Sequence, residues 1–210
     1  NPFRNLNFST LKASKQPGLN DIISNIEKAE KDDNIKGILL NLNSFEAGYA
    51  TTTEIRNALV KFKKSGKFLF AYAEYYSTKA YYLASAADKI YVHPEGAVDF
   101  KGLYAQLMFM KGALDKLEIE PEIIRHGKFK SAIEPFILDK MSPENKEQVA
   151  TFINSIWETI SSEIAESRKI SREALEQISD SLSAENAKDA LRLKLVDQLC
   201  YKDELEKILA

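Results

Sequence analysis

Two kinds of apolar pattern alternate along this 210-residue chain, and this alternation constrains the fold more than any other feature. Residues from Leu19 onward and residues 51–63 carry apolar side chains at helical spacing. The run between them, residues 35–42 (IKGILLNL), has a continuous apolar centre, which is typical of a strand buried on both faces of a parallel sheet. The alternation continues with expected strands at 68–73, 90–92 (ending at Pro94) and 121–125, and expected helices at 78–87 and 107–117. The sequence therefore predicts an α/β fold with a mostly parallel sheet and outer helices.

A long helix is expected at about residues 143–168. Ser142 suits an N-cap and Pro143 suits the first helical position. An apolar stripe then keeps helical spacing from Val149 to Ile164, and a stripe of this length needs a large packing partner. Residues 1–18 are polar and weakly patterned, so we interpret them as a leading arm. No long linker interrupts residues 19–210, which predicts a single domain.

Composition excludes several kinds of chemistry. Two histidines and one cysteine, Cys200, exclude a multi-cysteine zinc site and leave little room for a metal centre or a histidine-based triad. Neither G-x-G-x-x-G nor G-x-x-x-x-G-K occurs, so no phosphate-binding loop is expected. The balance of 29 Lys and Arg against 31 Asp and Glu argues against nucleic acid as the main partner. We therefore expect no metal and no cofactor.

A few side chains allow both a functional and a structural interpretation. A tyrosine cluster could stack bases or sugars (Tyr72, Tyr75, Tyr76, Tyr81 and Tyr82). The structural interpretation is favoured, because Tyr81 and Tyr82 lie on an expected core helix and basic residues are sparse among the tyrosines. His93 and His126 are each followed by a residue typical of strand ends or turns, and no serine or cysteine motif marks a catalytic partner. By composition, Lys130 is an ordinary solvated lysine. It could act as a general base only when neutral, and lowering its pKa from about 10.4 to about 7 costs close to 5 kcal/mol.

Six segments together resemble the signal peptide peptidase A family, whose members are membrane-anchored serine peptidases with a serine–lysine dyad. The most specific is residues 127–136 (GKFKSAIEPF), which resembles the lysine-bearing motif of the family. The supporting segments are 35–42, 66–72 (GKFLFAY), 81–91 (YYLASAADKIY), 141–143 (MSP) and 195–197 (LVD). The resemblance is to the N-terminal repeat of the long, two-repeat form. It implies a crotonase/Clp-protease-like spiral of ββα units.

The resemblance also assigns one catalytic role, that of Lys130 as the general base. In one-repeat members the nucleophile lies in an S-G-G-Y-Y segment, whereas this chain has Thr78, Lys79 and Ala80 before its two tyrosines. The S-P-G-G loop for the oxyanion corresponds here to residues 44–48, which end in Ala47 and Gly48. In the two-repeat form the second half holds the nucleophilic serine and the oxyanion hole. The resemblance therefore implies that this chain supplies the base without the nucleophile.

The same resemblance implies a function for the whole protein, the degradation of cleaved signal peptides. The implied partners are the C-terminal half of the same protein, signal-peptide or other peptide substrates, and further copies in a homo-oligomer. The implied location is the periplasmic side of the bacterial inner membrane, with an anchor absent from this chain, and the fragment alone is expected to be inactive. Two alternatives remain, a non-catalytic module for assembly and substrate cradling, and an acyl-CoA-binding crotonase relative.

Overall fold

The computed structural model describes residues 6–7, 12–13, 17–122 and 131–209. Four parallel strands form the central sheet in the order β3-β4-β5-β6, and a separate antiparallel pair, β1-β2, precedes them. The strand bounds are β1 (Leu6–Asn7), β2 (Lys12–Ala13), β3 (Gly37–Asn41), β4 (Phe68–Ser77), β5 (Lys89–Asp99) and β6 (Gln198–Leu199). The α/β prediction with a parallel sheet is confirmed, and the arrangement is consistent with a crotonase/Clp-like fold.

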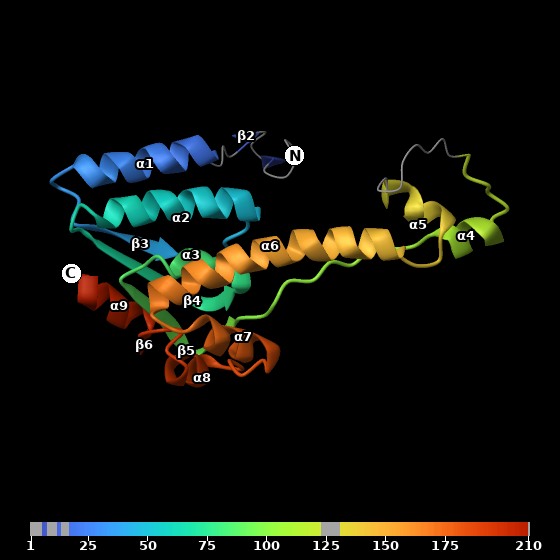
Figure 1. Cartoon of the computed structure of the whole chain (residues 1–210). Coiled ribbons are helices and arrows are strands. Elements are labelled where there is room, and N and C mark those ends of the chain that lie inside the picture. Colours follow the sequence, from blue (N-terminus) through green and yellow to red (C-terminus); the bar gives the residue numbers. More distant parts are fainter. Residues whose placement is uncertain (1–5, 8–11, 14–16, 123–130, 210) are drawn as a thin grey trace.

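The helices cover the two faces of the sheet unequally (Figure 1). Alternate residues of β4, Leu69, Ala71 and Ala73, face the main core, which also contains side chains from most of the helices. The other face carries Tyr72 and a smaller cluster beneath α9. The helix bounds are α1 (Leu19–Lys31), α2 (Tyr49–Lys63), α3 (Thr78–Ala84), α4 (Lys111–Lys116), α5 (Glu134–Ile137), α6 (Pro143–Arg168), α7 (Arg172–Asp180), α8 (Ala187–Arg192) and α9 (Lys202–Leu209). Burial on both faces accounts for the apolar runs of β4 and β5. The expectation that residues 35–42 are buried on both faces is wrong, because β3 is an edge strand and its Leu39 is 40% exposed.

The expectation that the third strand ends at Pro94 is wrong. Strand β5 continues to Asp99, and its pairing with β4 shifts register between Ala73 and Tyr75. A β-bulge accommodates a proline because the proline needs no ladder partner there. Gly96 lies in the same irregular stretch, where an added Cβ would come within 2.0 Å of the Glu74 carbonyl oxygen. A close approach between two backbones therefore keeps the strand in the sheet beyond the proline.

Two further expectations need correction in the segment that follows. The helix expected at 107–117 is shorter, because α4 begins at Lys111 and residues 101–110 form neither helix nor strand. Of the strand expected at 121–125, residues 121 and 122 are not in a strand, and the other three lie outside the described residues. An apolar pattern without a packed partner on both sides does not distinguish a strand or helix from an extended segment.

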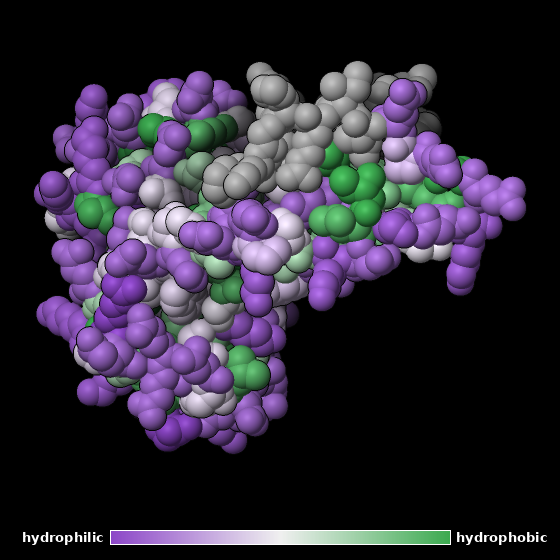
Figure 2. Space-filling view, turned by 45° about the vertical axis from the view of Figure 1, so that its right-hand side comes forward, coloured by the Kyte–Doolittle hydropathy of each residue, from purple (hydrophilic) through white to green (hydrophobic). Residues whose placement is uncertain are grey.

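The long helix α6 is confirmed at residues 143–168, but only its C-terminal half lies on the body of the molecule (Figure 1). We call the part that extends away from the body the projection, and define it as residues 101–122 and 131–152. Ile160 and Ile164 are buried in the core, whereas Phe152 is 65% exposed. Hydrophobic side chains gather on the projection near its base (Figure 2). The apolar stripe therefore continues beyond the surface that buries it.

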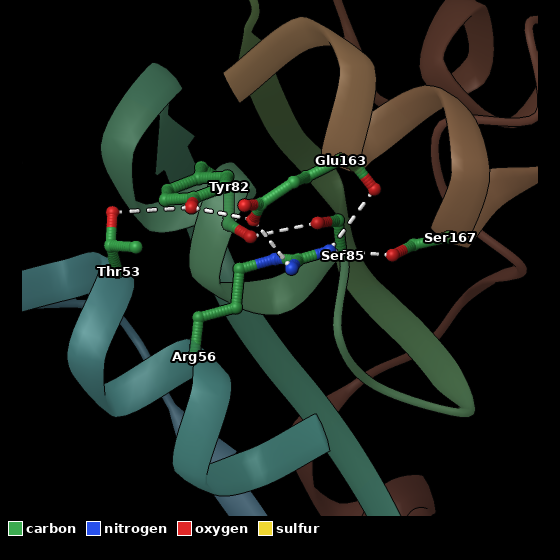
Figure 3. A network of polar contacts seen from close by, with 6 residues as sticks. All are labelled: Thr53, Arg56, Tyr82, Ser85, Glu163 and Ser167. Carbon is green, nitrogen blue, oxygen red and sulfur yellow. Dashed lines mark hydrogen bonds and ion pairs between the residues drawn. The ribbon is translucent and has the colours of Figure 1, made fainter. Parts of the chain in front are cut away.

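A buried arginine fastens α6 to the body (Figure 3). Arg56 of α2 donates to Glu163 Oε2 at 2.7 Å, to the Glu163 carbonyl oxygen at 3.0 Å and to Ser167 Oγ at 2.6 Å. The hydroxyl of Tyr82 in α3 donates to the same Glu163 carboxylate at 2.7 Å and lies 3.2 Å from Thr53 Oγ1. One polar network thus joins α2, α3 and α6.

The closing LVD segment has a structural role. Asp197 accepts a hydrogen bond from the Ile90 backbone N–H at 2.7 Å and a bidentate pair from Arg168 at 2.9 and 3.0 Å. The hydroxyl of Tyr81 donates to the Leu195 carbonyl oxygen at 2.8 Å. These contacts join the end of α6 to the core strand β5. The segment therefore closes the fold rather than lining a site.

The buried tyrosines predict that the protein loses stability in alkaline solution. Burial raises the pKa of Tyr82 to about 12 and those of Tyr76 and Tyr81 also above their ordinary value of 10.0. Because the folded state favours the protonated phenols, their contribution is complete below pH 10 and declines above it, and that of Tyr82 is lost as the pH rises through about 12. We expect the urea midpoint to fall between pH 9 and 11.5, together with the appearance of phenolate absorbance. An unchanged midpoint over this range would contradict the prediction.

Candidate functional site

A groove of about 1040 Å³ lies where the projection leaves the body. One wall is the apolar stripe of α6, from Val149 to Ile156, and another is the extended segment of residues 101–107. The end nearer the body carries polar side chains, Thr78, Lys79, Asp99 and Lys101. The groove thus combines an apolar channel with the segment expected to correspond to the nucleophile loop.

Thr78 is held by backbone groups. Its hydroxyl lies 3.0 Å from the Asp99 carbonyl oxygen and 3.2 Å from that of Lys101, to both of which it is placed to donate, and it accepts from the Lys101 N–H at 3.2 Å. Within the described part of the chain its hydrogen-bond partners are all main-chain atoms. A nucleophilic hydroxyl needs a base within hydrogen-bond reach, and none of these groups is one. In this arrangement Thr78 fastens the end of β5 to α3.

The two loops expected to be degenerate lie together. Lys79 Nζ donates to the Ala47 carbonyl oxygen at 2.9 Å and sits 5.2 Å from the centre of the Tyr49 ring. Gly48 forms the N-cap of α2, and the buried Ala80 donates its N–H to Ser77 Oγ at 3.2 Å. An oxyanion hole needs N–H donors aimed at one point. Here one loop presents a carbonyl oxygen, and the N–H of Ala80 is already bonded to Ser77.

Lys130 lies outside the described residues, as does His126. The described end of the lysine motif forms a 3-10 turn (Ser131–Ile133) and α5. Its Glu134 is 1% exposed and accepts hydrogen bonds from Ser142 N at 3.1 Å, Ser142 Oγ at 2.5 Å and Asn145 Nδ2 at 2.8 Å. Ser142 also caps α6 by accepting from Asn145 N, as expected from the sequence. Glu134 therefore fixes the lysine motif to the start of the long helix, a role that residue type alone did not reveal.

The remaining candidates are structural. His93 lies in the irregular stretch of β5, where its Nδ1 accepts from the Glu95 N–H at 3.1 Å. Cys200 is buried, and the core position of Tyr81 and Tyr82 is confirmed. Tyr72 and Tyr76 are also buried, whereas Tyr75 is 51% exposed. Within the described ranges there is no group of three or more potential metal ligands. No helix among these residues is long and apolar enough to cross a membrane.

The negative charge of Asp99 is balanced by a neighbouring lysine within the groove. Its carboxylate pairs with Lys101 Nζ at 2.6 Å and accepts from the Tyr75 hydroxyl at 2.7 Å. Partial burial opposes its ionisation, but the hydrogen bonds from Lys101 and Tyr75 outweigh it and hold the pKa of Asp99 below its ordinary value. Burial and the same hydrogen bond raise the pKa of Tyr75 to about 12. Asp99 is therefore an anion whose charge is already matched.

Comparison with known proteins agrees with the resemblance. The model of "Peptidase family S49" matches residues 61–210, well over half of the chain. Protease 4 of Salmonella typhi is 39% identical over 203 residues, which cover 93% of this chain and 33% of that protein. The chloroplastic serine protease SPPA of Arabidopsis thaliana is 30% identical over 199 residues, which cover 93% of this chain and 29% of that protein. A putative signal peptide peptidase SppA of Enterococcus faecium is 24% identical over 197 residues, which cover 93% of this chain and 56% of that protein.

The chain spans about a third or less of the length of the first two of these relatives. The match includes the lysine motif, the Asp88-Lys89-Ile90 segment and the closing LVD segment. The structure places the described part of the lysine motif, residues 131–136, before the start of α6, Asp88-Lys89-Ile90 at the start of β5, and the LVD segment directly before β6. The chain belongs to peptidase family S49.

Proposed function

We propose that this chain is the N-terminal half of a serine peptidase that degrades cleaved signal peptides, and that Lys130 is its general base. The proposal is supported by a contrast within the chain. The lysine motif is intact and its Glu134 is buried in a hydrogen-bonded position. The loops that would hold a nucleophile and an oxyanion are instead joined by a hydrogen bond from Lys79 Nζ to the Ala47 carbonyl oxygen. A base without a nucleophile requires a serine from elsewhere, which we assign to the second half of the longer protein.

The reaction is acyl transfer. The neutral amine of Lys130 takes the proton of the serine hydroxyl while the serine oxygen attacks the scissile carbonyl carbon. The tetrahedral intermediate collapses, its C–N bond breaks, and the lysine delivers the proton to the leaving amine. Water, activated by the same lysine, then hydrolyses the acyl-enzyme. The groove contributes by holding an extended apolar peptide along α6.

The location and assembly belong to the same proposal. The longer protein is anchored in the bacterial inner membrane by a segment outside this chain, with this domain on the periplasmic side. Further copies pack against the projection, where Tyr104 is 86% and Met108 78% exposed. This exposure also favours the second candidate, a module that assembles copies and cradles substrate without a chemical role. Lys130-dependent turnover distinguishes the two.

The direct test compares the longer protein with the 210-residue chain on an apolar signal-peptide substrate. The longer protein should release peptide fragments, and the chain alone should release none, because Thr78 is bonded only to main-chain groups among the described residues. Fragment release is measured by chromatography and mass spectrometry. Hydrolysis by the chain alone that disappears in a Thr78→Val variant would show that this half carries its own nucleophile.

A further inference from the structure

Lys79 is a cation with spare hydrogen-bonding capacity at the polar end of the groove. Its ammonium donates to the Ala47 carbonyl oxygen and lies over the Tyr49 ring, but no carboxylate of the described residues pairs with it. An ammonium has three N–H donors, and the described contacts use one of them for a hydrogen bond. The acidic residue that lines the groove, Asp99, is already matched by Lys101. The polar end therefore carries a net positive charge centred on Lys79.

The walls of the groove indicate what kind of molecule would bring the matching negative charge. Val149, Phe152 and Ile153 offer apolar surface along α6. Opposite them, the backbone of residues 102–107 makes no hydrogen bond to another described residue. Free main-chain N–H and C=O groups beside apolar pockets are suited to an extended peptide, whose own main chain can pair with them. A fatty acid would fill the apolar surface but leave these groups unpaired.

We propose that Lys79 binds the free C-terminal carboxylate of an apolar peptide that lies along residues 101–107. The identification of the ligand as a peptide rests on the proposed function, and the carboxylate adds a requirement that the proposed function does not contain. Charge-assisted hydrogen bonds between ammonium and carboxylate are among the stronger polar contacts in proteins. The position that corresponds to a catalytic loop in one-repeat relatives thus recognises one end of the substrate.

The test measures binding rather than turnover, so that it does not depend on the catalytic role of Lys130. The longer protein with Lys130→Ala is titrated with one labelled apolar peptide, prepared once with a C-terminal carboxylate and once with a C-terminal amide. We expect the carboxylate peptide to bind about tenfold more tightly than the amide. Lys79→Met should remove this difference by weakening the carboxylate peptide alone. Lys79→Arg should retain it, and Lys188→Met, on the exposed surface of α8, serves as the control.

Four results of this binding experiment would contradict the proposal. Equal binding of the two peptides to the protein with Lys79 intact would show that no carboxylate is recognised. A preference that survives Lys79→Met, or that Lys188→Met abolishes equally, would place the recognition elsewhere. Weakening of both peptides by the same factor in Lys79→Met, with the preference retained, would show that this side chain shapes the groove and does not bind the carboxylate. A long-chain fatty acid that binds while neither peptide does would identify a lipid as the ligand. If the longer protein with Lys130 intact fails to hydrolyse signal peptides while the carboxylate preference is present, the proposed function fails and the binding role of Lys79 stands.

Discussion

Replacing Lys130 with alanine in the longer protein should lower kcat for peptide hydrolysis by about a thousand-fold or more. Without the amine, no group of this half is assigned to take the proton from the serine, so both acylation and deacylation lose their base. Lys130→Arg should be equally inactive, because a guanidinium stays protonated at any working pH. Steady-state kinetics on an apolar peptide measures the loss. Circular dichroism and gel filtration should match those of the unmodified protein.

Lys128→Ala provides the matched control, because it removes a lysine two positions away in the same motif. We expect its kcat to stay within a few-fold of the original. Near-normal turnover by Lys130→Ala would refute the dyad and favour the module for assembly and substrate cradling. A similar loss in both lysine variants would indicate that the segment, rather than one amine, is needed.

The parts of the fold that were predictable depend on neighbours in the sequence. Helix α6 was predicted within its observed bounds because an N-cap, a proline and a periodic stripe are all local signals. The continuation of β5 past Pro94 was missed, because it depends on Gly96 approaching Glu74 of another strand. The same limit applies to residues 107–110, which were expected to be helical but form neither helix nor strand, and of which Leu107 lines the groove.

In the candidate site, too, individual residues could be identified from the sequence, whereas contacts between distant residues could not. Motif similarity identified Thr78, Lys79 and Ala47 as members of two loops, but the hydrogen bond that joins Lys79 to Ala47 requires the fold. Glu134 belongs to the recognised motif, yet its bonds to Ser142 and Asn145 appear only when the motif meets the start of α6. Single residues were therefore predictable, whereas the charge left unmatched at Lys79 was not.

The second large effect is expected at Arg56, which pairs with Glu163 across 107 positions of sequence. Arg56→Ala should lower the free energy of unfolding by about 3 kcal/mol. Arg56 is only 5% exposed, and its loss removes the ion pair of the Glu163 carboxylate, which keeps the Tyr82 hydroxyl as a donor, and the hydrogen bonds to the Glu163 carbonyl oxygen and Ser167 Oγ. The variant also loses the stacking of the guanidinium 5.1 Å from the centre of the Tyr82 ring. Urea denaturation followed by the fluorescence of Trp157, the single tryptophan, measures the change.

Arg172→Ala is the matched control, because Arg172 also pairs with two acidic groups, on Glu158 and Glu176, but at the surface. Water replaces an exposed ion pair at little cost, so its urea midpoint should not move measurably. The contrast isolates burial as the cause, since both substitutions remove the same side chain from a helix. Equal midpoints for the two variants would mean that the network in Figure 3 does not hold α6 to the body. In that case the groove at the base of the projection would depend on apolar packing alone, and Arg56→Ala would leave peptide binding unchanged.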